Sequence, residues 1–358
     1  MQIVQLHLVS EGTPMQMEEE RIGRGGLVWI PSVVSDSWSQ STMLERLRRR
    51  ILRTLAGTLS VQHDFLLSAL HELPLTLAVF HWLNEDSEIV VRDLNRRSTP
   101  YVIVNHFQNT RLVDPKIRKQ IAGAVSVSGV SSVDVPPFLA DRFVNVSDGI
   151  DAEFFDIARA RRVEREIRSP LILLPSRVTE GKGHLEAVHA LVRLSRMNVV
   201  ATLAFAGMIE NEGVARAALG TAKANGLGDQ VMLLGELDAE ALRDWYGASD
   251  IVILTTHSEG LGRVLLEAQA MQKPVVAYDA GGVRQAIADG ETGHLVPIGD
   301  VEILAERIRQ LLGDARVRDQ MGYAGRLRVV NQFSLDALAE RHETLYTDAL
   351  ALAGLGRK

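Results

Sequence analysis

The second half of this chain alternates short apolar runs with segments of helical spacing, and this pattern restricts the fold more than any other feature. Six apolar runs follow Pro170 in order: LILLP, ATLAFAG, VMLLG, DIVILTT, PVVAYD and HLVP. After Gly183, residues Leu185, Val188 and Leu191 recur on one helical face, as expected for a helix that covers a sheet. Strands that alternate with helices predict a parallel, doubly wound α/β sheet in this half.

The first half shows the same pattern less regularly. Because 358 residues exceed what one hydrophobic core usually supports, we expect a second α/β sheet there. The charged stretch 151–170 has little apolar periodicity and predicts a linker near residues 156–169. A last helix is expected from about Leu335 to Leu352, and its spacing alone allows packing on either domain. The candidate strands of the first half are QIVQLHLV, LVWI, TLAVFHW, PYVIVNH, GAVSVS and RFVNVS.

Composition excludes several classes of protein. The net charge of -6 gives no overall basic surface, so we expect no nucleic-acid partner. No apolar run approaches the roughly 20 residues that span a bilayer, and the start of the chain lacks the features of a signal peptide, which favours a cytoplasmic protein. The chain has no cysteine, no Asp-x-Asp triplet and no histidines at metal-ligand spacing, so we expect neither a bound metal nor a cofactor.

The most informative stretch is residues 256–282, THSEGLGRVLLEAQAMQKPVVAYDAGG, in which a strand ends in a glycine-containing turn and a helix begins at about Arg263. Ligands of open α/β sheets bind at the carboxyl ends of strands, where helix N-termini offer N–H groups to phosphate. Glu259 and Glu267 are eight positions apart, and both lie near one face if the helical frame reaches back to Glu259. Two ionised carboxylates would accept hydrogen bonds from sugar and ribose hydroxyls. The alternative is a solvated helix residue at 267 and a helix-start acid at 259.

A second informative stretch, which contains basic residues, follows the first strand of this half: LILLPSRVTEGKGHLEAV. Arg177 has a planar guanidinium group that can donate two parallel hydrogen bonds to phosphate, and Lys182 has a compact positive charge. The pair is therefore suited to neutralise a diphosphate without a metal. The alternative is an ordinary basic loop between strand and helix. Gly281 and Gly282 again place flexible backbone at the end of a strand, which is a weak indication by itself.

The order of these elements is similar to the nucleotide-sugar domain of the family 4 retaining glycosyltransferases, also called glycosyl transferases group 1. The resemblance covers residues 170–300 and includes that family's Glu-x7-Glu spacing at Glu259 and Glu267. It implies the GT-B architecture, in which two Rossmann-like doubly wound domains face a cleft, and catalysis without a metal. In such enzymes the terminal helix crosses back to the first domain. The resemblance therefore implies an acceptor-side domain of residues 1–160 plus 335–358 and a nucleotide-sugar domain of residues 168–334.

The resemblance also implies a role for each site residue. It places Arg177 and Lys182 on the diphosphate, Glu267 on the ribose hydroxyls, and Glu259 at the donor sugar together with the backbone of Gly260, Leu261 and Gly262. Leu261 stands where the family commonly has an aromatic residue, which is expected to alter the sugar pocket. The predicted catalytic residues are Glu259, Arg177, Lys182 and His106.

The first half resembles the family only in outline. His81 and His106 each end a candidate strand, and His106 is the better match to a histidine that family members place near the donor sugar. The alternative is a structural histidine at a domain edge, with its hydrogen bonds made within the protein. Residues 43–57 combine five arginines with four apolar residues at helical spacing. Such a helix either lies on an anionic membrane surface, which would suit a lipid-linked acceptor at the inner membrane face, or packs on the domain by its leucines.

We therefore expect a metal-independent, retaining transfer of a hexosyl group from a nucleotide diphosphate sugar to a hydroxyl of a glycan, glycolipid or small molecule, as in polysaccharide or glycoconjugate biosynthesis. Two alternatives stay open. One is a sugar-nucleotide epimerase or hydrolase on the same architecture, and the other is a catalytically silent GT-B subunit that binds a partner.

Overall fold

The computed structural model divides the chain into two compact units, residues 1–146 with 341–358 and residues 147–340. Nearly all of 149–163 and 170–352 is described. In the first half the described residues are 3–6, 8–9, 19–22, 25–28, 30–31, 77–80, 91–92, 94–96, 98, 100–105, 126–129 and 143–145. His81, His106 and the basic segment 43–57 lie outside the described residues, so the predictions made for them stay predictions.

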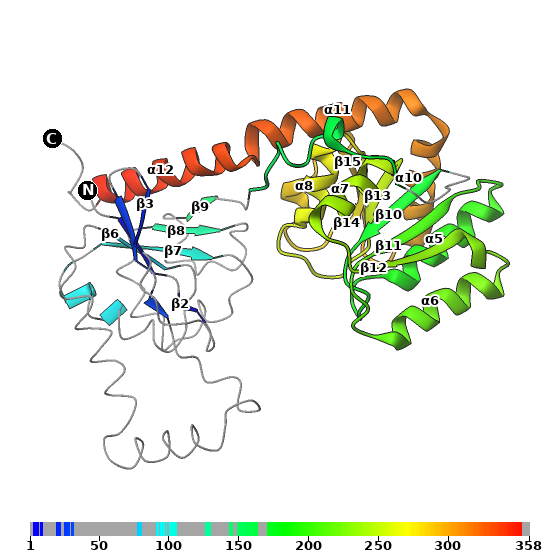
Figure 1. The fold of residues 1–358 in the computed structure, drawn as a ribbon, viewed down its shortest axis with the longest axis horizontal. Coiled ribbons are helices and arrows are strands. Elements are labelled where there is room, and N and C mark those ends of the chain that lie inside the picture. Colours follow the sequence, from blue (N-terminus) through cyan, green and yellow to red (C-terminus); the bar gives the residue numbers. More distant parts are fainter. Residues whose placement is uncertain are drawn as a thin grey trace, which may run out of the picture. The chain divides into compact units, whose positions relative to one another are not determined.

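The second unit is built on a six-stranded parallel sheet, as the alternation of strand and helix patterns predicts (Figure 1). Numbered one to six along the chain, its strands follow the order 3-2-1-4-5-6 of a doubly wound fold. The chain order therefore reverses between β10 and β13, which are hydrogen-bonded neighbours. The strands are β10 (Leu171–Pro175), β11 (Thr202–Ala206), β12 (Val231–Gly235), β13 (Ile251–Leu254), β14 (Val275–Tyr278) and β15 (Gly293–Val296).

Helices cover both faces of this sheet (Figure 1). One face shares a buried hydrophobic cluster with α5 (His184–Arg196), α6 (Glu212–Ala224) and α10 (Val301–Gly313). Ile251 and Ile253 of β13 belong to that cluster, and because strand side chains alternate, Val252 and Leu254 point to the opposite face. The other helices of the unit are α7 (Ala239–Ala248), α8 (Arg263–Ala270), α9 (Val283–Ala286) and α11 (Ala315–Gln332), with 3-10 turns η3 (Ile157–Arg159) and η4 (Gly228–Gln230).

The first unit contains a five-stranded parallel sheet in the order β1-β6-β7-β8-β9, which confirms the expected second α/β sheet. Its strands are β1 (Ile3–Leu6), β6 (Leu77–Phe80), β7 (Tyr101–Asn105), β8 (Ser126–Gly129) and β9 (Phe143–Asn145). The candidate strand LVWI does not join this sheet. Its residues fall in β4 (Gly25–Val28), which pairs antiparallel with β3 (Glu19–Ile22), and in β5 (Ile30–Pro31), which pairs with β2 (Leu8–Val9).

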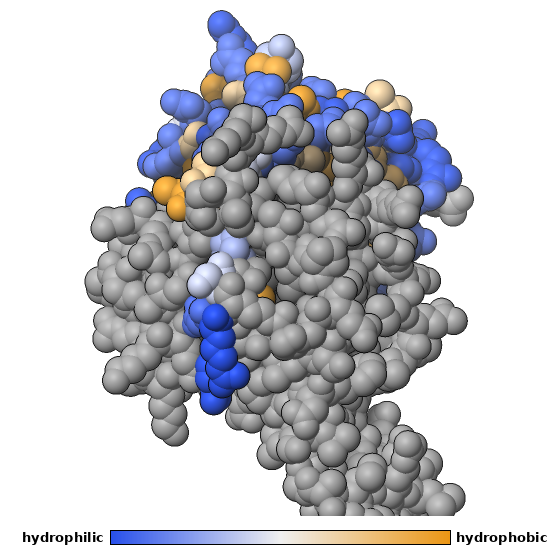
Figure 2. Space-filling view, turned by 90° about the vertical axis from the view of Figure 1, so that its left-hand side faces the viewer, coloured by the Kyte–Doolittle hydropathy of each residue, from blue (hydrophilic) through white to orange (hydrophobic). Residues whose placement is uncertain are grey.

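The last helix, α12 (Leu335–Leu352), has the predicted bounds. Its residues up to Glu340 group with the second unit and those from Arg341 with the first. None of the described helices is long and apolar enough to cross a membrane. On α11 and at the start of α12, Tyr323, Leu327 and Leu335 are exposed. Figure 2 shows hydrophobic side chains as separate groups among hydrophilic ones over its coloured part, as is normal for a protein surface.

Arg326 is one of the residues that attach the charged stretch 151–170, predicted as a linker, to the second unit. The Nη1 atom of Arg326 on α11 donates to the carbonyl oxygens of Ala152 at 2.6 Å, Phe155 at 2.8 Å and Ala270 at 3.1 Å, and its Nη2 atom pairs with Asp156 at 2.9 Å. Because these bonds fix 152–156 on α8 and α11, the boundary between the units falls before this stretch, between residues 146 and 147.

We expect Arg326→Ala to lower the free energy of unfolding by roughly 2–4 kcal/mol, because it leaves partly buried carbonyl groups and a carboxylate without their donor. Urea unfolding followed by circular dichroism measures the change. The exposed Arg316 on the same helix provides the control, since Arg316→Ala removes an equal charge. Equal midpoints for the two variants would contradict the structural role of Arg326.

Candidate donor-binding site

Loops from separate strand–helix units meet at the carboxyl edge of the second-unit sheet. We name them by the strand they follow: the β10 loop (176–183), the β13 loop (255–262) and the β14 loop (279–282). The chain order reverses between β10 and β13, and doubly wound sheets bind ligands at the carboxyl ends of strands at such a reversal. The backbone N–H of His257 donates to the Gly181 carbonyl at 2.9 Å, and the Thr255 hydroxyl donates to the Gly183 carbonyl at 2.9 Å. These bonds hold the β10 and β13 loops together.

Lys182 and Glu259, two of the predicted catalytic residues, contact each other at this edge. The Nζ atom of Lys182 lies 3.0 Å from Oε2 of Glu259, and each side chain is 22% exposed. The other carboxylate oxygen of Glu259 accepts from the N–H of Gly260 at 3.3 Å. A charge-assisted bond between partly buried groups orders both side chains, while their remaining exposure keeps them accessible to a ligand. The structure thus brings together a cation and a carboxylate from loops that are far apart in sequence.

The β14 loop supports Glu259 through its backbone. The N–H of Gly282 donates to the Glu259 carbonyl at 3.0 Å. A Cβ atom at Gly281 would lie 2.3 Å from that same carbonyl oxygen, so only glycine permits this approach. Gly281, which the sequence marked only weakly, is therefore required at this position for a steric reason.

The helical frame of α8 does not reach back to Glu259. The helix begins at Arg263, and its N-cap residue Gly262 has a left-handed backbone with φ of 80°. Glu259 is therefore positioned by the loop and not by a helix face shared with Glu267. Leu261, which stands at the position of the family's aromatic residue, is 3% exposed, so its side chain packs inside the protein and the backbone is what it offers to a ligand.

Glu267 is not a solvated helix residue, which corrects the alternative left open by the sequence. It is 9% exposed, and its Oε2 atom accepts a hydrogen bond from the Tyr246 hydroxyl at 2.9 Å. Burial raises the pKa of Glu267 above its ordinary value, while the Tyr246 hydroxyl and the charge of Arg263 act to lower it. Among the described residues Tyr246 is its one hydrogen-bond donor, and a buried carboxylate with so few donors is more typical of a binding site than of a purely structural role.

Arg177 lies in the same β10 loop as Lys182 but has a different partner. Its Nη1 atom pairs with Glu210, which follows β11, at 2.6 Å, and its side chain is 60% exposed. An ion pair this exposed contributes little free energy, so an incoming anion can replace Glu210 at small cost. Arg177 therefore pairs with Glu210 and does not share the contact between Lys182 and Glu259.

Sequence reasoning missed two buried polar residues at this site. Tyr246 lies near the end of α7, where an aromatic residue is normally interpreted as part of the hydrophobic core. Nothing in the sequence therefore marked it as a functional residue. His184 follows Lys182 directly; burial lowers its pKa to about 4, and its ring packs edge-on against Phe205. At neutral pH His184 is therefore uncharged and adds no positive charge beside Lys182.

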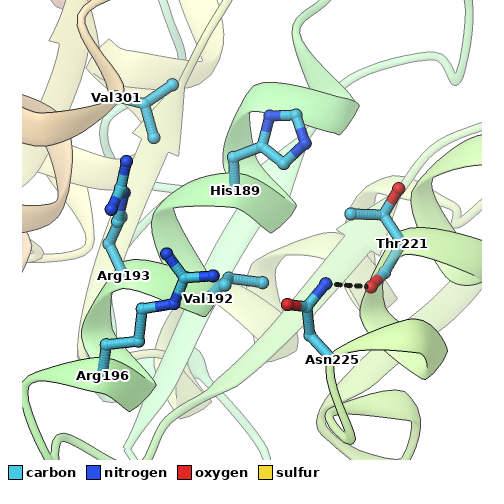
Figure 3. Close-up of a pocket in the computed structure, with 7 residues that line it drawn as sticks. All are labelled: His189, Val192, Arg193, Arg196, Thr221, Asn225 and Val301. Carbon is cyan, nitrogen blue, oxygen red and sulfur yellow. Dashed lines mark hydrogen bonds between the residues drawn. The ribbon is translucent and has the colours of Figure 1, made fainter.

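A surface cavity of about 460 Å³ lies elsewhere on the second unit (Figure 3). Its lining includes Arg193 and Arg196, which occupy the last turn of α5, while Lys182 lies just before the first turn of that helix. Basic side chains at a helix C-terminus interact favourably with the helix dipole, and Arg193 also pairs with Glu302. The two arginines thus have a structural explanation. The remaining lining residues are His189, Val192, Thr221, Asn225 and Val301.

Comparison with known proteins assigns this domain to a family. Residues 156–328 match the family described as glycosyl transferases group 1. D-inositol 3-phosphate glycosyltransferase of Corynebacterium diphtheriae is 40% identical over 127 residues, which are 36% of this chain and 30% of that protein. The enzyme of the same name from Corynebacterium aurimucosum is 31% identical over 225 residues, which are 59% of this chain and 52% of that protein. The chain thus spans about half the length, or less, of these curated relatives.

Solved structures show the fold of the whole chain. A glycosyltransferase from Rickettsia africae superimposes with a TM-score of 0.74 at 18% identity and covers 98% of both chains. HepE from Anabaena, solved in complex with UDP, gives a TM-score of 0.69 at 17% identity and covers 97% of this chain and 100% of its own. The fold is therefore GT-B, a class of α/β protein with two Rossmann-like units. Within it, residues 156–328 are the part of the chain that matches the glycosyl transferases group 1 family.

Proposed function

We propose that this chain is a retaining glycosyltransferase that takes a sugar from a nucleotide diphosphate donor without a metal ion. The contact between Lys182 and Glu259, in loops that follow the two strands at the reversal of strand order, carries the proposal; Glu267, buried on the helix that follows the β13 loop, is proposed as the second carboxylate. Together these residues supply one cation for the diphosphate and two carboxylates for hydroxyl groups at one edge of a group 1 domain. The presence of UDP in the HepE structure supports a nucleotide diphosphate as the ligand of this edge.

In the proposed reaction the bond between the anomeric carbon and the diphosphate oxygen breaks, and a bond to the acceptor oxygen forms on the same face of the sugar. The departing phosphate accepts the proton of the acceptor hydroxyl. Lys182, joined by Arg177, stabilises the negative charge that develops on the diphosphate. Once Lys182 turns to phosphate, Glu259 becomes free to accept hydrogen bonds from the donor sugar.

The positioning groups complete the proposal. Glu267 accepts hydrogen bonds from the ribose hydroxyls, and the backbone of Gly260, Leu261 and Gly262 lies against the sugar. His106 is proposed to face the donor sugar from the first unit. The acceptor is a hydroxyl of a glycan, glycolipid or small molecule, and the chain acts in the cytoplasm, with residues 43–57 as a peripheral contact to the inner membrane face if the acceptor is lipid-linked.

Glu267→Gln is expected to weaken donor binding about 10- to 100-fold, since hydrogen bonds to a charged group contribute about 1.5–3 kcal/mol. The glutamine oxygen still accepts from Tyr246, so the fold is retained. The measurement is calorimetric titration with uridine, guanosine and adenosine diphosphate sugars in the presence of a chelator. Glu212→Gln on the exposed start of α6 is the matched control and should bind as the wild type does.

Each result of this titration decides between functions. Chelator-resistant binding of one donor, weakened in Glu267→Gln alone, supports the transferase. Binding followed by release of free or epimerised sugar without any acceptor would identify a hydrolase or epimerase instead. No binding of any donor by the wild type would overturn the proposal and favour a silent GT-B subunit.

A further inference from the structure

Tyr246 joins two helices that flank β13. It lies on α7, before the strand, and Glu267 lies on α8, after it. The tyrosine is 0% exposed, and its hydroxyl donates to Oε2 of Glu267 at 2.9 Å. Its ring meets the ring of Phe155 edge-on, with centroids 6.0 Å apart, and its carbonyl accepts from the Ser249 hydroxyl at 2.8 Å. Ring packing and backbone therefore fix the position of the hydroxyl independently of Glu267.

The bond with Tyr246 leaves one carboxylate oxygen of Glu267 unused. Among the described residues, Oε1 makes no hydrogen bond, yet it is not one of the fully enclosed atoms without a partner. Glu267 as a whole is 9% exposed, so its side chain is buried but not completely enclosed by the described residues. A phenylalanine at 246 would fill the same volume in the core, so the hydroxyl serves the carboxylate and not the packing of α7.

We propose that Tyr246 is a positioning residue of the donor site, whose hydroxyl holds Oε2 of Glu267 so that Oε1 faces the ribose hydroxyls of the nucleotide sugar. This inference rests on the proposed function and adds to it a residue that never touches the donor. Oriented this way, the carboxylate is ordered before the ligand arrives, which removes part of the entropy cost of binding.

The same bond also sets the protonation of the site. Burial raises the pKa of Glu267, and the Tyr246 hydrogen bond lowers it, so removal of the hydroxyl raises the pKa further. A protonated carboxyl loses acceptor capacity toward ribose hydroxyls. Donor affinity therefore decreases as the pH falls through the pKa of Glu267. Without the hydroxyl, that decrease begins at a higher pH.

Charged groups lie on α8 itself and on the helices packed against it, α9 and α11. Arg263, on α8 itself, lowers the pKa of Glu267 through its charge. Arg326 of α11, which packs on α8, is bonded to the Ala270 carbonyl. Arg284 of α9 forms an ion pair with Asp279. All three remain in Tyr246→Phe, so the shift between wild type and variant reports the hydroxyl.

The test is calorimetric titration of full-length wild type and Tyr246→Phe with the uridine, guanosine and adenosine diphosphate sugars, over a series of decreasing pH values that starts at pH 8. At pH 8 we expect a loss of affinity of about 3- to 10-fold, the range for one hydrogen bond. The loss should grow as the pH decreases, with the midpoint of the pH dependence moved to higher pH in the variant. In the Glu267→Gln background, Tyr246→Phe should no longer shift the pH dependence, since the titrating group is absent.

Tyr278→Phe is the matched control. Tyr278 is also 0% exposed, and its hydroxyl has no hydrogen-bond partner among the described residues. Its removal should change neither affinity nor pH dependence. If Tyr246→Phe lowers only the melting temperature and leaves both quantities unchanged, the hydroxyl is structural and the positioning role is wrong, while the proposed function stands. If the wild type binds no donor at all, both are overturned.

Discussion

Replacing Lys182 by alanine is expected to reduce kcat/KM for the nucleotide sugar about 10²- to 10³-fold, the usual effect of removing one group that stabilises transition-state charge. Lys182 is the cation that contacts Glu259, and in the proposed reaction it stabilises the charge on the departing diphosphate. Stability should change by only about 1–2 kcal/mol, because the partly buried Glu259 loses its cation partner but keeps its bond to the N–H of Gly260. The measurement combines initial rates of nucleoside diphosphate release with urea unfolding of the same samples.

The exposed Lys223 near the end of α6 provides a charge-matched control for this experiment. Lys223→Ala alters the net charge equally but lies away from the carboxyl edge of the sheet, so it should retain full activity. Normal turnover in Lys182→Ala would remove this lysine from the mechanism. A large loss of stability without a change in turnover would make the contact with Glu259 a structural one.

Gly183→Ala is expected to destabilise the protein by at least about 3 kcal/mol and to abolish donor binding, because it combines backbone strain with a steric clash. The residue has φ of +73°, and a Cβ atom there would lie 2.0 Å from the carbonyl oxygen of Thr255. Relief of that clash separates the β10 and β13 loops and moves Lys182 away from Glu259. Thermal unfolding and donor titration measure the two consequences.

Gly181→Ala separates the clash from the strain. Gly181 has nearly the same backbone, with φ of +75°, but a Cβ atom there meets nothing within 4 Å. It should cost only the left-handed strain of an alanine, about 1–2 kcal/mol, and keep most donor affinity. Similar losses in the two variants would show that backbone strain alone, and not the approach of the two loops, governs this site.

The predictability of the fold follows the strength of its local patterns. In the second unit each strand is an apolar run that ends at a turn, so all six were correctly located, and α8 begins at Arg263 as expected. The run LVWI has the same apolar character but lies outside the five-stranded sheet, because strand pairing depends on partners that a local pattern does not contain. The charged stretch 151–170 was interpreted as a linker for a similar reason. Arg326, whose hydrogen bonds fix the first residues of this stretch, is 170 positions away from Asp156 in the sequence.

The sequence by itself determined the fold class of the protein, and it marked the edge of the sheet where we propose the donor site. Alternating apolar runs and helical spacings define the doubly wound sheet, and glycines and charged residues after successive strands mark its carboxyl edge, since both signals are local in the chain. Only the tertiary structure decided which of those charged groups meet. It joined Lys182 to Glu259, turned Arg177 toward Glu210, and buried Glu267 against Tyr246. These contacts depend on how loops and helices from separate strands pack across the reversal of strand order, and that packing is set by long-range burial that no single stretch of residues encodes.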